Sequence, residues 1–250
     1  MRSLEGSRDR KFSSSRGYEP GLALQESVHE NVLSLMMNRA DRAEILGYLA
    51  AEGNEYHYAH THWRFFPTRG LSGKWYLIHY KQDAVEFTNL DLAIQQRFLD
   101  LLDRVYGMDK ARFDRKGRVR IRPRTVVSDL LSHSRLGCLS WQVPKAVMAG
   151  DCSTRAAWCR GYADGDGTVA KTEICLDSTN SLGLNQVQDL LQSLGIHSKV
   201  RGPYSREPYL DRFSLVIHKE SLRQYAGLIG FNHPKKTHAL TKLLGSPGGS

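Results

Sequence analysis

The sequence predicts an α+β fold of two pseudo-symmetric halves, each with the element order αββαββα. Two observations support the duplication. A helical segment that ends in an acid followed by glycine occurs twice, with the acids at Glu52 and Asp166, 114 positions apart (166 − 52). A second pair of similar segments, residues 85–89 and 176–180, leads into an apolar helical pattern in each half. We therefore expect a diverged internal repeat.

In the first half, apolar residues at helical spacing predict helices, and β-branched or aromatic runs predict strands. A short amphipathic helix at Ser27–Met37 comes before the acidic helix, and a long hairpin follows it. The elements expected after the acidic helix are strands Tyr56–Phe66 and Lys74–Thr88, helix Asn89–Tyr106, strands Arg112–Asp114 and Arg118–Arg122, and helix Thr125–Leu131.

In the second half, a linker with Pro144 and Gly150 leads to the second acidic helix, and the same order repeats. The expected elements are strands Thr168–Ala170 and Glu173–Leu176, helix Leu182–Leu194, strands Ser198–Tyr204 and Tyr209–Ile217, a helix from Glu220 and a final helix at His233–Leu244.

By residue number, we expect an unstructured arm or an expression remnant at 1–25, the first half at 26–137, a linker at 138–152, the second half at 153–245 and a flexible tail at 246–250.

The two acidic helices share the pattern Gly-Tyr, three residues, an acid and a glycine. Small residues also lie four apart in each helix, Gly47 with Ala51 and Gly161 with Gly165. One face of each helix therefore lacks bulky side chains, so a neighbouring backbone can approach closely. We expect the two helices to pack on each other through these faces.

Such packing would bring Glu52 and Asp166 side by side at the C-terminal ends of two helices. Exposed carbonyl groups and the negative end of the helix dipole favour a cation there. Two carboxylates that face one gap repel each other unless a proton or a metal neutralises them. The arrangement suits a hard divalent ion such as Mg²⁺, which could activate water in phosphodiester cleavage. Ordinary helix-end features are the alternative, and a single copy would not distinguish the two.

These helices resemble the two signature helices of the LAGLIDADG homing endonucleases, in the single-chain form with one motif per half. In that family the last acid of the pattern is the metal ligand, which implies Glu52 and Asp166 here. The first copy has Ala50 where the second has Asp164. A catalytic role therefore does not extend to Asp164, which we expect to cap a helix or to pack.

The resemblance covers about residues 38–240 and implies two antiparallel sheets that form a saddle for DNA. It implies a monomeric, intron-encoded enzyme that cuts both strands of a specific double-stranded DNA site and leaves short 3′ overhangs. Mg²⁺ or Mn²⁺ would be the cofactor, with Ca²⁺ as a non-catalytic substitute. An intein origin fits less well, because the chain neither begins with Cys or Ser nor ends in His-Asn.

The resemblance also implies a basic residue near the active site after the last strand of a half. Lys219 holds that place in the second half, and Arg122 or Arg124 is the counterpart in the first. Asn89 and Asn180, at the strand-to-helix turns, are candidates for orienting water. A turn or a helix cap is an equally good interpretation of both.

A strand ribbon fits the major groove of DNA and presents alternate side chains to it. Most basic groups on such strands bind phosphate, and for any single one the alternative is a solvated surface charge. The shorter first hairpin of the second half predicts fewer base contacts there and a long, asymmetric target. The candidate DNA-binding residues are His57, His60, His62, Arg64, Lys74, Tyr76, His79, Lys81, Arg118, Arg120, Arg122, Lys171, Lys199, Arg201, Arg206 and Arg212.

The composition of the chain further limits the functions that it can have. The net charge of +9 is compatible with nucleic acid, and no run approaches the ~20 apolar residues of a membrane span. We expect an intracellular protein without a membrane partner. Its four cysteines (Cys138, Cys152, Cys159, Cys175) should be reduced and buried, and its four tryptophans (Trp63, Trp75, Trp141, Trp158) should lie in the core.

Two rival functions remain open at this point. One is a splicing maturase of the same fold that binds intron RNA, with or without nuclease activity. The other is a non-catalytic DNA-binding regulator. Retention of both acids argues against the regulator, because a scaffold needs neither of them.

Overall fold

The computed structural model describes residues 39–67 and 73–245. The expected arm at 1–25, the helix at Ser27–Met37 and the tail at 246–250 lie outside the described residues. No described helix has the length and apolar character needed to cross a membrane.

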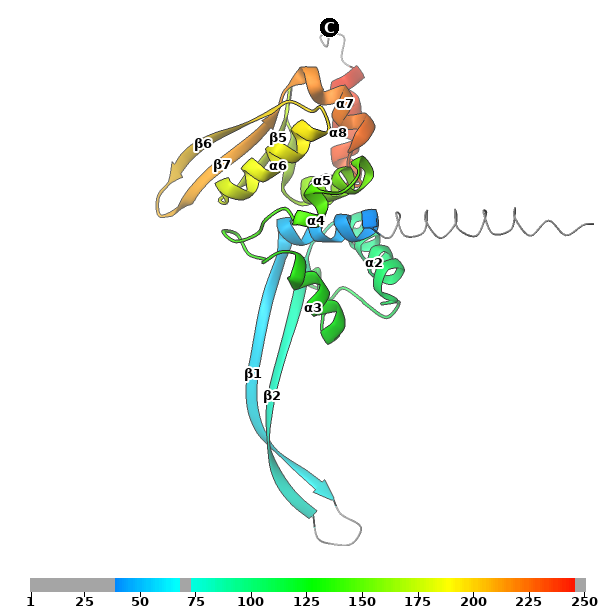
Figure 1. Cartoon of the computed structure of the whole chain (residues 1–250), viewed down its shortest axis with the longest axis vertical. Coiled ribbons are helices and arrows are strands. Elements are labelled where there is room, and N and C mark those ends of the chain that lie inside the picture. Colours follow the sequence, from blue (N-terminus) through cyan, green and yellow to red (C-terminus); the bar gives the residue numbers. More distant parts are fainter. Residues whose placement is uncertain (1–38, 68–72, 246–250) are drawn as a thin grey trace, which may run out of the picture. The chain divides into compact units, whose positions relative to one another are not determined.

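The first half begins with a helix over residues 39–52 and continues into a three-stranded antiparallel sheet of order β1-β2-β3 (Figure 1). The elements after the helix are β1 (Gly53–Pro67), β2 (Gly73–Thr88), α2 (Leu92–Tyr106), β3 (Arg118–Ile121) and α3 (Arg124–His133).

The expected strand Arg112–Asp114 is absent from this half, so its order is αββαβα over the described residues. The backbone N–H of Asp114 donates to Arg118 O (2.8 Å), and the N–H of Gly117 donates to Asp114 O (3.0 Å). These two bonds close a turn that connects Asp114 to the start of β3, in place of the expected strand.

The second half contains a four-stranded antiparallel sheet of order β4-β5-β7-β6. Every element expected in it is present. The elements are α4 (Lys145–Met148), α5 (Cys152–Asp166), β4 (Gly167–Val169), β5 (Ile174–Ser178), α6 (Ser181–Ser193), β6 (Ser198–Arg206), β7 (Tyr209–Ile217), the short 3₁₀ helix η1 (Lys219–Ser221), α7 (Leu222–Leu228) and α8 (Pro234–Gly245).

Each sheet has one face against the helices and one open face. In the first sheet the helix-side residues are odd-numbered, and Val85, Phe87, Val119 and Ile121 among them are almost fully buried. The even-numbered residues form the open face, because side chains alternate along a strand. From Asp83 outward, most residues of the β1–β2 hairpin are exposed on both faces (Figure 1).

Two of the four tryptophans are therefore not in the core. Trp141 and Trp158 are buried as expected, but Trp63 and Trp75 are 62% and 64% exposed. Both of the exposed residues lie on the outer hairpin, beyond the stretch of sheet that the helices cover. The expectation for these two was wrong, because burial of a strand depends on what packs against it.

The cysteines also differ from expectation. All four are free, but only Cys159 is buried, whereas Cys138 and Cys152 are exposed. Cys152 begins α5, and Cys138 lies in the linker, so neither is covered by a packed element.

The two acidic helices pack backbone to backbone, as the small residues predicted. A Cβ atom added to Gly47 would lie 2.2 Å from the carbonyl oxygen of Trp158, and one added to Gly161 would lie 2.3 Å from that of Glu44. One turn further on, a Cβ at Gly165 would lie 2.5 Å from Ala51 Cβ. The contact is reciprocal, and it leaves no room for a side chain on either glycine.

We predict that Gly47→Ala destabilises the protein by about 1–3 kcal/mol, the usual cost of overpacking. Alanine favours a helix over glycine by about 1 kcal/mol, so the loss would come from the backbone clash alone. The matched control is Gly227→Ala in α7, where an added Cβ meets nothing within 4 Å. Chemical denaturation should show destabilisation only for Gly47→Ala. Equal effects of the two substitutions would refute the close packing.

Candidate functional site

Glu52 and Asp166 are the last residues of the two acidic helices, and both line one pocket of about 280 Å³. Residues of both halves form its wall, with Gly53 and Asn54 from the first half and Asp177 to Thr179 from the second. The structure therefore brings the two predicted acids together. The packing at Gly161 and Gly165 explains this, since Glu52 comes against α5 just before Asp166.

The two carboxyl groups are held in an environment that disfavours their charge. Burial raises the pKa of Glu52 above its usual value. Burial and, next, the negative charge of Glu52 raise the pKa of Asp166 to about 7. Burial disfavours the charged form of both carboxyl groups, and Asp166 in addition experiences the negative charge of Glu52.

Asn89 contacts one of the two acids directly. Its Nδ2 donates to Glu52 Oε2 (3.1 Å), and its Oδ1 accepts the backbone N–H of Asp91 (2.8 Å). The second bond fixes the orientation of the amide, so the first one orients the carboxylate of Glu52. Asp91, rather than Asn89, caps α2 through its side chain.

Asn180 has a different role from Asn89. It caps α6 by accepting the N–H of Gly183 (2.9 Å), and its Nδ2 donates to the carbonyl oxygen of Trp141 (2.6 Å) in the linker. Both ends of its amide are thus used within the fold. Of its two possible roles, the structure supports the helix cap rather than water orientation.

Lys236 on α8 is a residue of this site that the sequence did not predict. Its Nζ donates to the carbonyl oxygens of residues 163–165 at 2.6–3.0 Å, in the last turn of α5. Burial lowers the pKa of Lys236, and the nearby negative charges of Asp164, Glu52 and Asp166 act in the opposite direction. The ammonium group therefore counters part of the negative charge of the acid pair.

Asp164 is a buried structural residue, as expected. Its carboxylate accepts the hydroxyl of Tyr48 (2.9 Å) and the backbone N–H groups of Asn232 and His233 (3.0 Å each). These bonds tie α5 to the first acidic helix and to the segment that begins α8. Asp164 thereby helps to place Lys236 against the end of α5.

The two basic residues expected near the acids lie elsewhere. Lys219 follows Ile217, which pairs with Ile174 at the far end of β5 from the pocket. Arg122 follows β3 and lines a separate pocket with Lys81 and Arg124. The strand register moves both away from the carboxylates, so the structure does not support them as catalytic groups.

The predicted DNA-binding residues of the first half divide between the two faces of the sheet. His60, His62, Arg64, Lys74, Tyr76, Arg118 and Arg120 are even-numbered and belong to the open face. His57, His79 and Lys81 are odd-numbered and belong to the helix-side face. A duplex bound to the open face would not contact the three residues of the helix-side face.

Arg120 is committed to a partner within the protein. Its guanidinium forms two hydrogen bonds with the buried carboxylate of Glu86 and lies over the rings of Tyr56 and Tyr58. Arg118 is similarly paired with Asp114 (2.8 Å). These two arginines are therefore paired with carboxylates of the protein, and they contribute little free positive charge to the open face.

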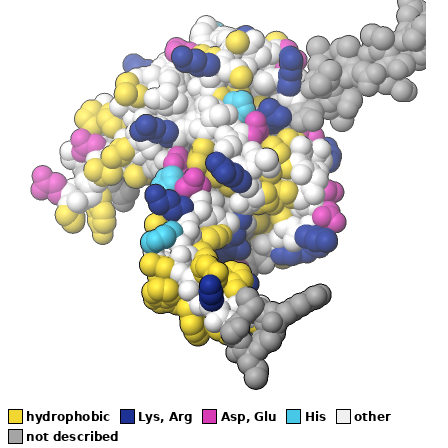
Figure 2. Space-filling model, turned by 60° about the horizontal axis from the view of Figure 1, so that its bottom comes forward, with side chains coloured by type: hydrophobic (Ala, Val, Ile, Leu, Met, Phe, Trp, Pro, Cys, Tyr) yellow, Lys and Arg dark blue, Asp and Glu magenta, His cyan; other side chains and the backbone are white. Residues whose placement is uncertain are grey.

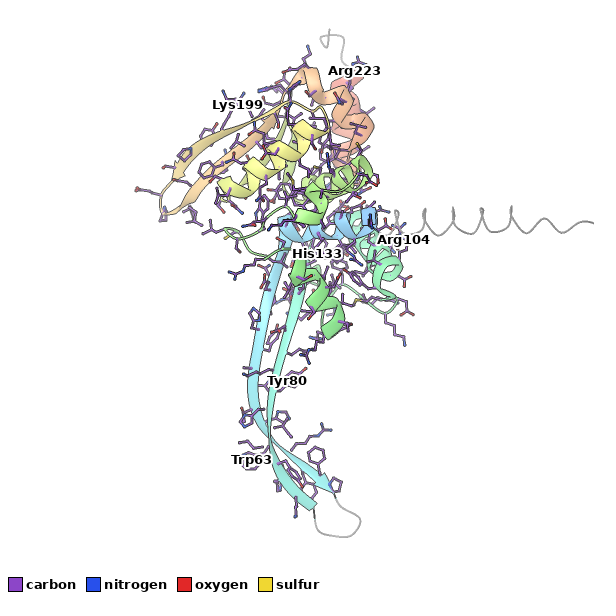
Figure 3. All side chains as sticks on the ribbon, viewed as in Figure 1. Trp63, Tyr80, Arg104, His133, Lys199 and Arg223 are labelled. Carbon is purple, nitrogen blue, oxygen red and sulfur yellow. The ribbon has the colours of Figure 1, made fainter. Side chains whose placement is uncertain are left out.

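In the second sheet, Lys199, Arg201 and Arg212 lie on the open face, with Ser214 and Val216 between them in the register. Arg212 reaches Asp177, a pocket residue, at 3.6 Å and lies over the ring of Tyr204. Figure 3 shows Lys199 on β6, at the edge of this sheet. Lys171 is exposed in the turn before β5, and the side chain of Arg206 lies outside the described part of the chain.

Comparison with known proteins agrees with this geometry. Residues 153–230, which include α5 and its acid, match the family model described as a LAGLIDADG-like domain. The match lies within the second half of the chain. The first acidic helix is outside the matched residues and packs reciprocally against α5.

Two curated relatives are similar over part of their length. Homing endonuclease I-ApeI of Aeropyrum pernix is 30% identical over 111 residues, which cover 43% of this chain and 49% of that protein. A replication factor C small subunit of Thermococcus kodakarensis is 26% identical over 179 residues, which cover 67% of this chain and 19% of that protein. The chain therefore spans about half or less of the length of these relatives.

Solved structures of I-DmoI share the fold. I-DmoI in complex with DNA and Ca superposes with a TM-score of 0.59 at 12% identity, covering 82% of this chain and 98% of that one. I-DmoI in complex with DNA and Mn gives a TM-score of 0.56 at 12% identity, covering 77% and 97%. The LAGLIDADG fold, with two antiparallel sheets and helices, thus extends over both halves.

We predict that Asp166→Asn stabilises the metal-free protein at high pH only. The folded-state pKa of about 7 lies above the usual 3.8, so the folded protein holds this proton more tightly than the unfolded chain. Stability is therefore lost as pH rises from about 4 to 7. With chelator present, the variant should match the wild type near pH 4 and exceed it by about 1–3 kcal/mol above pH 7. A difference that does not change with pH would contradict this.

We predict that Lys236→Met destabilises the protein by about 1–3 kcal/mol, because buried carbonyl groups of α5 lose their donor. The neighbouring Lys235 is exposed, so Lys235→Met should stay within about 0.5 kcal/mol of the wild type. Loss of the ammonium should also raise the pKa of Asp166, since Lys236 lowers it. Denaturation at several pH values measures both effects. Equivalence of the two lysine variants would exclude Lys236 from the site.

Proposed function

We propose that this chain is a site-specific double-strand DNA endonuclease that uses a divalent metal ion. The observation that carries the proposal is the convergence of one carboxylate from each half, Glu52 and Asp166, in a single pocket. Each half of the repeat contributes one acid. Such a pair matches a DNA duplex, because the two strands of a duplex are themselves related by approximate symmetry. The LAGLIDADG fold supports the same activity.

The residues present fit a hard cation. Glu52 and Asp166 offer oxygen ligands at two helix C-termini, and their raised pKa values reflect buried negative charge that a divalent ion would stabilise. Among the described residues, no cluster of three or more His, Cys, Asp or Glu side chains is arranged to hold a metal. Mg²⁺ commonly binds through one or two carboxylates and fills its remaining positions with water and substrate phosphate.

Mg²⁺ is the proposed cofactor, with Mn²⁺ as an alternative and Ca²⁺ as a non-catalytic substitute. The related I-DmoI has been seen in complex with DNA and Mn, in complex with DNA and Ca, and with its target DNA in the presence of Mg. When bound, such an ion would polarise the scissile phosphate and the attacking water.

The protein's own groups have separate tasks in this proposal. Asn89 holds the Glu52 carboxylate in one orientation, and Lys236 fixes the last turn of α5, from which Asp166 projects. Asp177 lines the pocket and is partly neutralised by Arg212. The open faces of both sheets would take the duplex, with His60, His62, Arg64, Lys74 and Tyr76 on the long hairpin.

The asymmetry of the two sheets favours a long, asymmetric target bound by a monomer. The β1–β2 hairpin has strands of 15 and 16 residues, whereas β4 and β5 have three and five. The longer ribbon reaches further along a groove and offers more side chains to base edges. We propose an intracellular, intron-encoded protein that leaves short 3′ overhangs.

The experiment is a cleavage selection. The protein is incubated with Mg²⁺ and a randomised duplex library, the cut ends are sequenced, and the selected site is used for kinetics. Recurrent cuts at one sequence with 3′ overhangs are expected. Tight, sequence-specific duplex binding without cutting would favour the regulator, and preferential binding of structured RNA would favour the maturase.

We predict that Glu52→Gln and Asp166→Asn each reduce cleavage of the selected site by about 10²–10³-fold or more, because each removes a ligand charge at the reacting phosphate. Duplex binding should persist, since loss of a carboxylate reduces repulsion of DNA.

Asn89→Ala should reduce the cleavage rate by about 10–100-fold, the usual effect of removing a group that orients a metal ligand.

The matched control is Asp189→Asn on the exposed surface of α6, which should cleave like the wild type. Cleavage by Glu52→Gln or Asp166→Asn at the wild-type rate would rule out the acid pair as the catalytic site. Binding assays on the same variants separate a lost catalytic group from a misfolded protein.

A further inference from the structure

The helix-side face of the outer β1–β2 hairpin carries an exposed apolar surface that the proposed endonuclease activity does not use. It consists of Trp63, Phe65, Trp75 and Leu77, which are 43–64% exposed. Their register explains the cluster, because Phe65 is opposite Trp75 and Trp63 is opposite Leu77. All four are odd-numbered, so they share the face that continues from Val85 and Phe87 at the base of the sheet.

The aromatic rings of this surface are close enough to act together. The ring centroids of Phe65 and Trp75 are 5.3 Å apart. Trp63 stands on the hairpin clear of the helices (Figure 3), and hydrophobic side chains gather on the hairpin in the space-filling view (Figure 2). We call these four residues the aromatic platform.

Toward the base of the hairpin, a basic pocket lies beside the same face. Its volume is about 600 Å³, and Lys81, Arg122 and Arg124 line it together with Ser128 of α3. Asp83 also lines the pocket, but its carboxylate is held by His57 at 2.8 Å. Among residues 39–67 and 73–245, none of the three cations has a salt-bridge partner. The pocket therefore has an uncompensated positive charge.

The platform and the pocket are joined along one strand. Lys81, His79, Leu77 and Trp75 are successive odd-numbered residues of β2 and so lie in a row on the helix-side face. At about 3.3 Å per residue, the distance from Lys81 to Trp75 is about 20 Å. His79 also bonds Thr61 across the hairpin (3.0 Å), which keeps the middle of the row polar.

A row of aromatic rings beside unpaired cations has the two features of a binding site for single-stranded nucleic acid. Unpaired bases stack on aromatic side chains, and each stacked base contributes about 1–3 kcal/mol, while basic groups follow the phosphates. A duplex keeps its bases stacked on one another, so it cannot use such a platform. A second copy of this chain, with its net charge of +9, is disfavoured by repulsion.

We propose that the helix-side face of the hairpin binds a single-stranded nucleic acid segment. Trp63, Phe65 and Trp75 stack its bases, and Lys81, Arg122 and Arg124 bind its phosphates. This surface is separate from the open face assigned to the duplex, since the two faces carry alternate residues of the same strands. It also gives His79 and Lys81, which the open face leaves out, a place in nucleic-acid binding.

The test is fluorescence anisotropy with labelled 15-mers of single-stranded RNA, single-stranded DNA and duplex DNA of random sequence. The double variant Trp63→Ala with Trp75→Ala should weaken single-strand binding by about 10–100-fold. It should leave duplex binding unchanged. The RNA and DNA arms show which of the two single strands binds more tightly.

The matched control is the double variant Phe66→Ala with Tyr76→Ala, whose rings are also exposed but belong to the open face. It should weaken duplex binding and leave single-strand binding unchanged. Because each double variant should keep one of the two affinities, each also reports that the hairpin remains folded.

The binding of phosphates has a test of its own. Lys81→Met with Arg124→Met should reduce the salt dependence of single-strand binding, by about 0.7 in slope for each phosphate that is no longer neutralised. The proposal is overturned if the tryptophan variant weakens duplex and single-strand binding equally, or if the wild type binds single strands no better than that variant does. Self-association that the tryptophan variant abolishes would instead assign the platform to a second copy.

Discussion

The structure depends on the contact of two helix backbones at Gly47 and Gly161. Each glycine leaves room for the carbonyl group of the other helix, at a distance that no side chain would permit. Glu52 and Asp166 each lie five residues beyond their glycine, about 7.5 Å along the helix. The crossing point therefore fixes both carboxylates near the interface, and one tight contact determines the position of the acid pair.

The same contact brings two negatively charged groups close together in a partly buried place, which is electrostatically unfavourable. Burial raises the pKa of both carboxyl groups, and the negative charge of Glu52 raises that of Asp166 further. The protein reduces this cost by other polar contacts around the interface. Lys236 places a positive charge at the end of α5. Two polar contacts cross between the halves, since Tyr48 donates to Asp164 (2.9 Å) and Arg160 reaches the buried Glu44 (3.5 Å).

Much of the fold could be predicted because its signals are local. Helical spacing, the acid-glycine ends and the long β-branched runs are all contained within short segments, and the corresponding elements are present. The polar surroundings of the site were harder to predict from the sequence. Lys236 is 70 positions from Asp166, and nothing in its neighbours marks it as a site residue. Trp63 and Trp75 were misplaced because exposure depends on which element covers a strand, and Lys219 because register decides which end of a sheet a residue occupies.

The two halves keep the same scaffold but differ in their polar groups. Glu86 and Asp177 occupy matching places in the repeat, and each is paired with an arginine of the adjacent strand, Arg120 and Arg212. Asn89 and Asn180 also match, yet the first bonds Glu52 and the second bonds the linker at Trp141. The linker exists only between the halves, so one of the two asparagines meets a carbonyl group that its counterpart cannot meet. A single connecting segment is thus enough to make two repeated carboxylates inequivalent, and a duplicated chain need not give each strand of a bound duplex the same surroundings.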